Sequence, residues 1–178
     1  MKKYLVLALC LLILTVGHAQ NYTEYFANKT LRVDYIFTGD ASCQNVCLDE
    51  LSVLPSWAGR HQHLAELPLQ GNGQIIMKDL ESGKTVYTTS FSSLFQEWLE
   101  TDEAKVVSKG FENTFLLPYP LRPVEIEITL LSPRKEVRTC LKHTVRPDDV
   151  LIHQKGTAHI TPHKYLLKSG ETDKCIDV

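Results

Sequence analysis

The most constraining feature of this sequence is a run in which apolar and polar side chains alternate strictly. Between positions 124 and 130, Val, Ile, Ile and Leu hold the even positions, and Glu, Glu and Thr hold the odd ones. Because successive side chains of a β-strand point to opposite faces, this run predicts a strand with one face on a core and the other in water. Such a strand is typical of an antiparallel sheet that is covered on one side only.

A second segment, residues 71–98, predicts a β-hairpin that is followed by a short helix. Residues 74–80 and 85–89 are the two strand-like runs, and Gly83 between them is free to take the positive φ that a tight turn requires. The segment after the hairpin has apolar residues three and four positions apart, as one face of a helix requires: Phe91, Leu94, Phe95 and Trp98. We therefore expect this hairpin and its apolar end to cover the open end of a β core.

The rest of the chain predicts an all-β fold. Strand-like runs recur at intervals of roughly ten to fifteen residues, Pro and Gly separate them, and long helical periodicity is scarce. This pattern is typical of an antiparallel β-sandwich, here with a short helical turn after the central hairpin. Residues 20–29 read as an entry arm, residues 43–54 as a strand with a helix as the weaker alternative, and residues 150–152 as a short final strand.

The chain divides into three parts. Residues 1–19 have two lysines, an apolar run and a small residue at Ala19, which predicts a cleaved signal peptide and an exported protein (periplasmic, cell-surface or extracellular). A membrane anchor is the alternative, but it needs about 20 apolar residues, and this run is shorter. Residues 20–155 are expected to form the β-sandwich, and residues 156–178 a linker and the truncated start of a following domain.

Charge and cysteine content exclude some classes of protein and leave one question open. The formal net charge is −2 and no basic run occurs, which argues against binding nucleic acid or an anionic membrane. Export permits disulfides among Cys43, Cys47, Cys140 and Cys175. Either Cys43 and Cys47 lie in a bend and pair, or each is a small buried apolar residue.

No group of residues predicts catalysis, a cofactor site or a metal site. A zinc site needs three or four converging ligands, no histidine here is followed by Glu, and His61 and His63 lie in a polar loop. Cys140 and His143 are three positions apart, so on a strand they face opposite sides and cannot act as nucleophile and base. We expect a buried thiol and a surface imidazole there.

A series of uncommon short sequence motifs resembles those of one protein family. In order, they are LRVDY at 31–35, LSVLP at 51–55 with WAGR at 57–60, LPL at 67–69 before GNG at 71–73, SF at 90–91 through FQEW at 95–98, GFENTF at 110–115 with PYP at 118–120, and PDD at 147–149. Over residues 21–153 the chain resembles the N-terminal domain of the IgA-peptidase family of bacterial zinc metallopeptidases, the sixty-fourth metallopeptidase family, which is common in gut Bacteroidetes.

The resemblance implies a β-sandwich that precedes a larger catalytic domain. In the family the zinc ligands belong to a His-Glu-x-x-His helix of that catalytic domain, so zinc is expected only there and no catalytic residue is carried over to this chain. The expected function is that of a non-catalytic accessory module, whose partners are the catalytic domain and its protein substrate. We expect an exposed apolar patch near the carboxyl-terminal strands, lined by Trp57, Tyr119 and Tyr165.

The alternative function is an independent exported module that binds glycans or cell-surface protein. That function requires exposed aromatic rings on a concave face, and Trp57, Trp98 and Tyr87 are the candidates.

Overall fold

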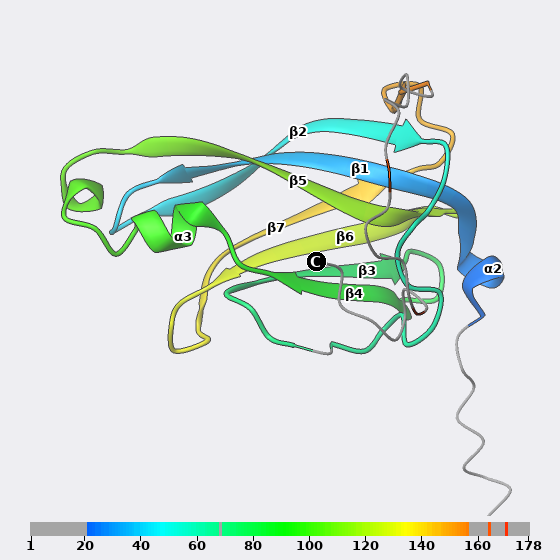
Figure 1. The fold of residues 1–178 in the computed structure, drawn as a ribbon, viewed down its shortest axis with the longest axis horizontal. Helices are drawn as coiled ribbons and strands as arrows, with labels where there is room; N and C mark the ends of the chain where they lie inside the picture. The colour runs from blue at the N-terminus through cyan, green and yellow to red at the C-terminus, as the bar shows by residue number, and fades with distance from the viewer. Residues whose placement is uncertain (1–20, 68, 157–163, 165–169, 171–178) are drawn as a thin grey trace, which may run out of the picture.

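The fold is a sandwich of two four-stranded β-sheets (Figure 1). The computed structural model describes residues 21–67, 69–156, 164 and 170. The first sheet has the order β5-β1-β2-β8 and the second the order β4-β3-β6-β7. The strands are β1 (Phe26–Gly39), β2 (Gln44–Leu54), β3 (Gly73–Asp79), β4 (Thr85–Phe91), β5 (Lys109–Pro120), β6 (Val124–Leu131), β7 (Val137–Val145) and β8 (His153–Gln154). The short helices are α2 (Tyr22–Tyr25), α3 (Leu94–Trp98) and the 3-10 turn η1 (Glu103–Lys105).

The predicted all-β sandwich is confirmed. All strand pairs are antiparallel except the two-residue parallel pair of β8 with β2. In β6 the even-numbered apolar residues from Val124 to Leu130 are buried, as the alternation predicts. On the opposite face, the Glu127 carboxylate lies 2.9 Å from Lys142 Nζ and 3.6 Å from Lys78 Nζ. None of the described helices is long and apolar enough to cross a membrane.

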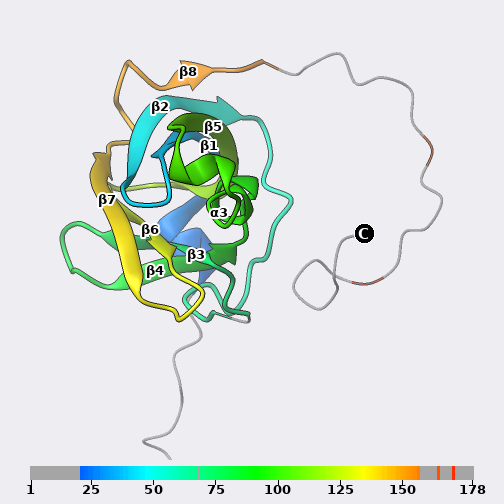
Figure 2. The ribbon, with the colours of Figure 1, turned by 90° about the vertical axis from the view of Figure 1, so that its left-hand side faces the viewer.

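The predicted hairpin and the short helix are also present. Strands β3 and β4 flank a turn in which Gly83 has φ +67°. Helix α3 then covers the end of the sandwich (Figures 1 and 2). The Phe95 ring is fully buried, whereas Leu94 is 72% exposed. The prediction that Leu94 shares the buried face is wrong because Phe91 still belongs to β4, so the helix begins only at Leu94.

A β-bulge explains why residues 43–54 lack clean alternation. Asp34 pairs with Glu50 and Tyr35 pairs with Leu48, so Asp49 is an extra residue in β2. Because one extra residue reverses which side chains face inward, both Val46 and Val53 are buried although their positions differ in parity. The strand is thus confirmed over the helix.

Several boundaries differ from the expectations. The entry arm is instead α2 and the start of β1, and the buried Phe26 anchors it. The last strand is β8, whereas residues 150 and 151 lie in a turn. Strand β5 continues through Pro118 and Pro120, which is possible because β5 is an edge strand and a proline there need not donate a hydrogen bond on its open side.

Neither interpretation of Cys43 and Cys47 is correct. Cys43, Cys47 and Cys140 are all free thiols and all exposed. Cys47 pairs with Ile36, whose neighbours in β1 face the core, and therefore points outward. Cys140 points outward from β7 and pairs with Thr129 of β6. Cys175 lies outside the described residues.

Exposure predicts that these three thiols react in the folded protein. Accessible thiols are modified much faster than buried ones, so Cys43, Cys47 and Cys140 should each be labelled by iodoacetamide without denaturant. Mass spectrometry of the tryptic peptides measures the labelling at each position. Protection of all three until denaturant is added would contradict this arrangement.

Candidate functional site

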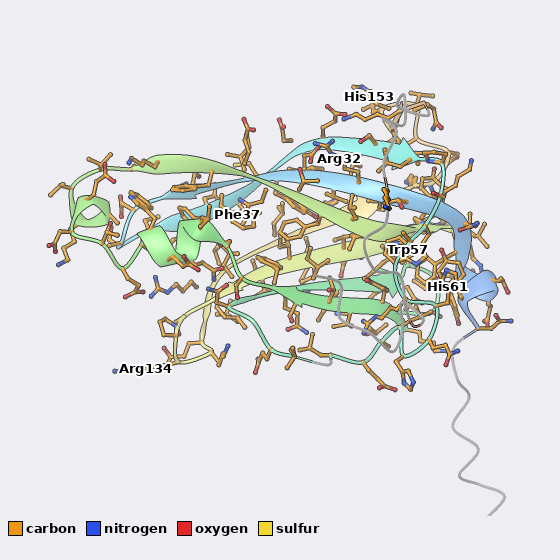
Figure 3. All side chains as sticks on the ribbon, in the orientation of Figure 1. Arg32, Phe37, Trp57, His61, Arg134 and His153 are labelled. Atoms are coloured by element: carbon orange, nitrogen blue, oxygen red, sulfur yellow. The ribbon has the colours of Figure 1, made fainter. Side chains whose placement is uncertain are left out.

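The two histidines that the sequence singled out have different partners in the fold. The His61 ring lies 4.3 Å from the Tyr22 ring, and His63 Nδ1 lies 2.9 Å from the Glu66 carboxylate (Figure 3). Among the described residues no group of three or more His, Cys, Asp or Glu side chains could hold a metal ion. His159 and His163 lie outside the described residues.

The expectation for Cys140 and His143 is half right. The two side chains do face opposite sides of β7, but the thiol is exposed and the imidazole is half-buried. Tyr35 of β1 lies with its hydroxyl 2.6 Å from His143 Nε2, which makes a polar pair between the sheets. Burial lowers the pKa of His143 to about 4 and raises that of Tyr35. This pair went unpredicted because its partners are 108 positions apart in the chain.

The three residues of the expected interaction surface have different surroundings. Trp57 is only 9% exposed, its ring meets Tyr87 edge-on at 6.1 Å, and its Nε1 donates to Arg60 O (Figure 3). Tyr119 is half-buried, and its hydroxyl donates to Pro147 O at 2.7 Å. Tyr165 lies outside the described residues. Trp57 therefore contributes mainly to the core, while Tyr119 supports the turn that follows β7.

That turn, residues 146–152, which we call the β7–β8 turn, carries the most exposed apolar pair of the described chain. Val150 is 92% exposed and Leu151 is 74% exposed, whereas the next residue, Ile152, is buried in the core. Asp149 fixes the turn, since its carboxylate accepts from Leu151 N at 2.9 Å and its carbonyl accepts from Ile152 N at 3.1 Å. The two apolar side chains are thus held out into solvent by a braced backbone.

Charged side chains attach the strand after this turn to the first sheet. The Glu50 carboxylate of β2 forms an ion pair with Lys155 Nζ at 2.8 Å and lies 3.4 Å from His153 Nδ1 (Figure 3). The Lys155 bond lowers the pKa of the Glu50 carboxyl group. Lys155 N also donates to Val53 O at 3.1 Å. The path of the chain beyond β7 is therefore fixed against β2 by both backbone and side-chain contacts.

Comparison with known proteins gives one family. The family model described as the peptidase M64 N-terminus matches residues 21–142, which is most of the described sandwich. No curated protein matches the chain. The matched region ends within β7, just before the β7–β8 turn.

Proposed function

This chain belongs to the peptidase M64 N-terminal family, and from that premise we propose that it is a non-catalytic accessory module of a secreted, IgA-peptidase-like zinc metallopeptidase. An N-terminal domain of a peptidase family is not itself the catalytic domain. Its task in this proposal is to support or position the catalytic domain or that domain's protein substrate. Zinc then belongs to the catalytic domain and not to this sandwich.

The observation that carries the proposal is the exposed pair Val150 and Leu151. Apolar side chains that a rigid turn holds in solvent mark a contact surface. The pair lies where the chain leaves the last long strand of the sandwich, just after the region that the family model matches. Tyr119, one of the residues expected at this surface, supports the same turn through Pro147.

The alternative, an independent module for glycans or cell-surface protein, has less support. Two of its three candidate rings, Trp57 and Tyr87, are 9% and 6% exposed and belong to the core. The third, Trp98, packs against Phe95 and Phe111 at 6.0 and 5.4 Å. Rings that are engaged in this way offer little face for a sugar to stack on.

We also propose that the protein is exported. The predicted signal peptide, residues 1–19, supports this proposal. Expression in a Gram-negative bacterium should give a periplasmic protein whose first residue is Gln20. Amino-terminal sequencing measures the cleavage site. An uncleaved cytoplasmic product would contradict the export of this chain.

The docking proposal predicts that charge at the β7–β8 turn weakens binding to a catalytic domain. The measurement is biolayer interferometry of the purified protein against a peptidase catalytic domain of the same family. The double variant Val150→Asp, Leu151→Asp should bind at least about tenfold more weakly, since about 1.4 kcal/mol of lost apolar contact suffices for that change.

Leu94→Asp is the matched control, because Leu94 is equally exposed and lies on α3 at the other end of the sandwich. It should leave the affinity unchanged. Both variants should keep the melting temperature of the parent protein. Undiminished binding by the double variant at an unchanged melting temperature would contradict docking at this turn.

A further inference from the structure

A cavity of about 220 Å³ lies beside the carboxyl end of α3, far from the β7–β8 turn. Its apolar lining comes from Leu99, Leu131 and Pro133. Leu99 and Leu131 are 5% and 7% exposed, so they form the floor, whereas Pro133 is exposed. The site is smaller than a typical small-molecule pocket, which encloses about 300–1,000 Å³. It is large enough for a single side chain of another molecule.

Hydrogen bonds keep the walls of this cavity in place. The buried Gln96 of α3 donates from Nε2 to Leu131 O at 3.1 Å and also to Asn72 O. These two hydrogen bonds attach α3 to the end of β6 and to the residue that precedes β3. Lys135 Nζ donates to Gly71 O at 2.7 Å, which attaches the β6–β7 turn with Pro133 to the segment before β3. The cavity is therefore preformed, and an occupant need not rearrange it.

The charges around the cavity favour a cation. Glu97, Glu100 and Arg138 line it together with the apolar floor. Arg138 Nη2 lies 3.4 Å from Glu100 Oε1, whereas Glu97 forms no ion pair with any described residue. Of the charged side chains that line the cavity, two are carboxylates and one is a guanidinium, so the lining itself has an excess of negative charge. An occupant with a carboxylate would meet Glu97 without compensation.

An apolar floor beneath an unpaired carboxylate matches one kind of side chain. Lysine and arginine carry a long apolar stem that ends in a cation, and they commonly lay the stem on apolar surface while the charge stays in a polar setting. We propose that this cavity receives a lysine or arginine side chain from a partner polypeptide. The stem lies on Leu99 and Leu131, and the cation reaches Glu97 at the exposed side.

The test is a titration of the ¹⁵N-labelled purified protein, followed by NMR. The probe is the peptide acetyl-Gly-Lys-Gly-amide, and the comparison peptides replace its lysine by norleucine or by glutamate. The lysine peptide should shift the amide signals of Leu99, Glu100 and Arg138 saturably, with the signals of the β7–β8 turn unmoved. Norleucine keeps the stem without the charge and should bind several-fold more weakly. Equal binding of all three peptides, or no saturable shift, would overturn the proposal.

Two variants separate recognition of charge from damage to the fold. Glu97→Gln removes the unpaired carboxylate and should weaken the lysine peptide about two- to fivefold, the range of an exposed ion pair. Arg138→Gln removes the competing cation and should strengthen the same peptide by a similar factor. Glu81→Gln, in the exposed β3–β4 turn at the other end of the sandwich, is the matched control and should change nothing. If Glu97→Gln and Arg138→Gln both weakened binding, their effect would be structural and the proposal would fail.

This inference is independent of the proposed accessory function. Its test measures peptide binding at the cavity beside α3, whereas the docking experiment measures binding of a catalytic domain at the β7–β8 turn. Either result can fail while the other holds.

Discussion

Replacing Phe95 by alanine is expected to lower the free energy of unfolding by about 3–5 kcal/mol, the usual cost of removing a large buried ring. Phe95 is fully buried and its ring centroid lies 6.1 Å from that of Phe37, 5.5 Å from Phe111 and 6.0 Å from Trp98. These rings come from β1, β5 and α3, so the cavity left behind would open at the junction of three elements. Since small domains have a total stability of about 5–15 kcal/mol, such a loss is a large share of it.

Equilibrium unfolding in urea, monitored by tryptophan fluorescence, measures this loss. Leu94→Ala is the control, because Leu94 precedes Phe95 in the same helix but is 72% exposed. Its effect should stay within about 0.5 kcal/mol, as for most surface substitutions. If the two substitutions had similar effects, α3 would not be the cover of the core that the structure describes.

The second large effect is a loss of stability in acid that His143 causes. Burial holds the pKa of His143 near 4 in the folded protein, whereas an unfolded histidine titrates near 6.5. Below pH 6.5 the unfolded chain binds the proton and the folded chain does not, so acid favours unfolding. The stability is fully present above pH 6.5 and is lost as the pH falls toward 4. Between pH 7 and pH 5 the expected loss is about 2 kcal/mol.

The variant His143→Gln tests this assignment, since glutamine can also form a hydrogen bond with the Tyr35 hydroxyl but does not titrate. Urea unfolding at pH 7 and at pH 5 should show the loss of about 2 kcal/mol in the parent protein and a much smaller one in the variant. Above pH 5 the carboxylates contribute little to the difference, because their pKa values lie lower. An equal acid sensitivity in both proteins would assign the effect to groups other than His143.

Much of the fold was predictable because its signals are local. The alternation at positions 124–130 requires only that successive side chains of a strand point in opposite directions, and β6 follows it as far as Ile128. Thr129, expected in water, is instead buried. The turn at Gly83 requires only the φ freedom of that residue. The interaction surface near the carboxyl-terminal strands stays a prediction. The apolar residues that occupy this place, Val150 and Leu151, were expected in a strand.

The sequence by itself thus determined the class of fold, the hairpin with its helical cover and the likeness to a peptidase amino-terminal domain. Only the tertiary structure decided which side chains are buried in two situations: where a β-bulge shifts the register of a strand, and where a residue far away in the sequence packs against it. The extra residue Asp49 reverses the faces of β2 and places Cys47 outside. Contact with Tyr35, far away in the chain, holds the half-buried His143 between the two sheets. Burial depends on what packs opposite a residue, and local spacing carries no information about that neighbour.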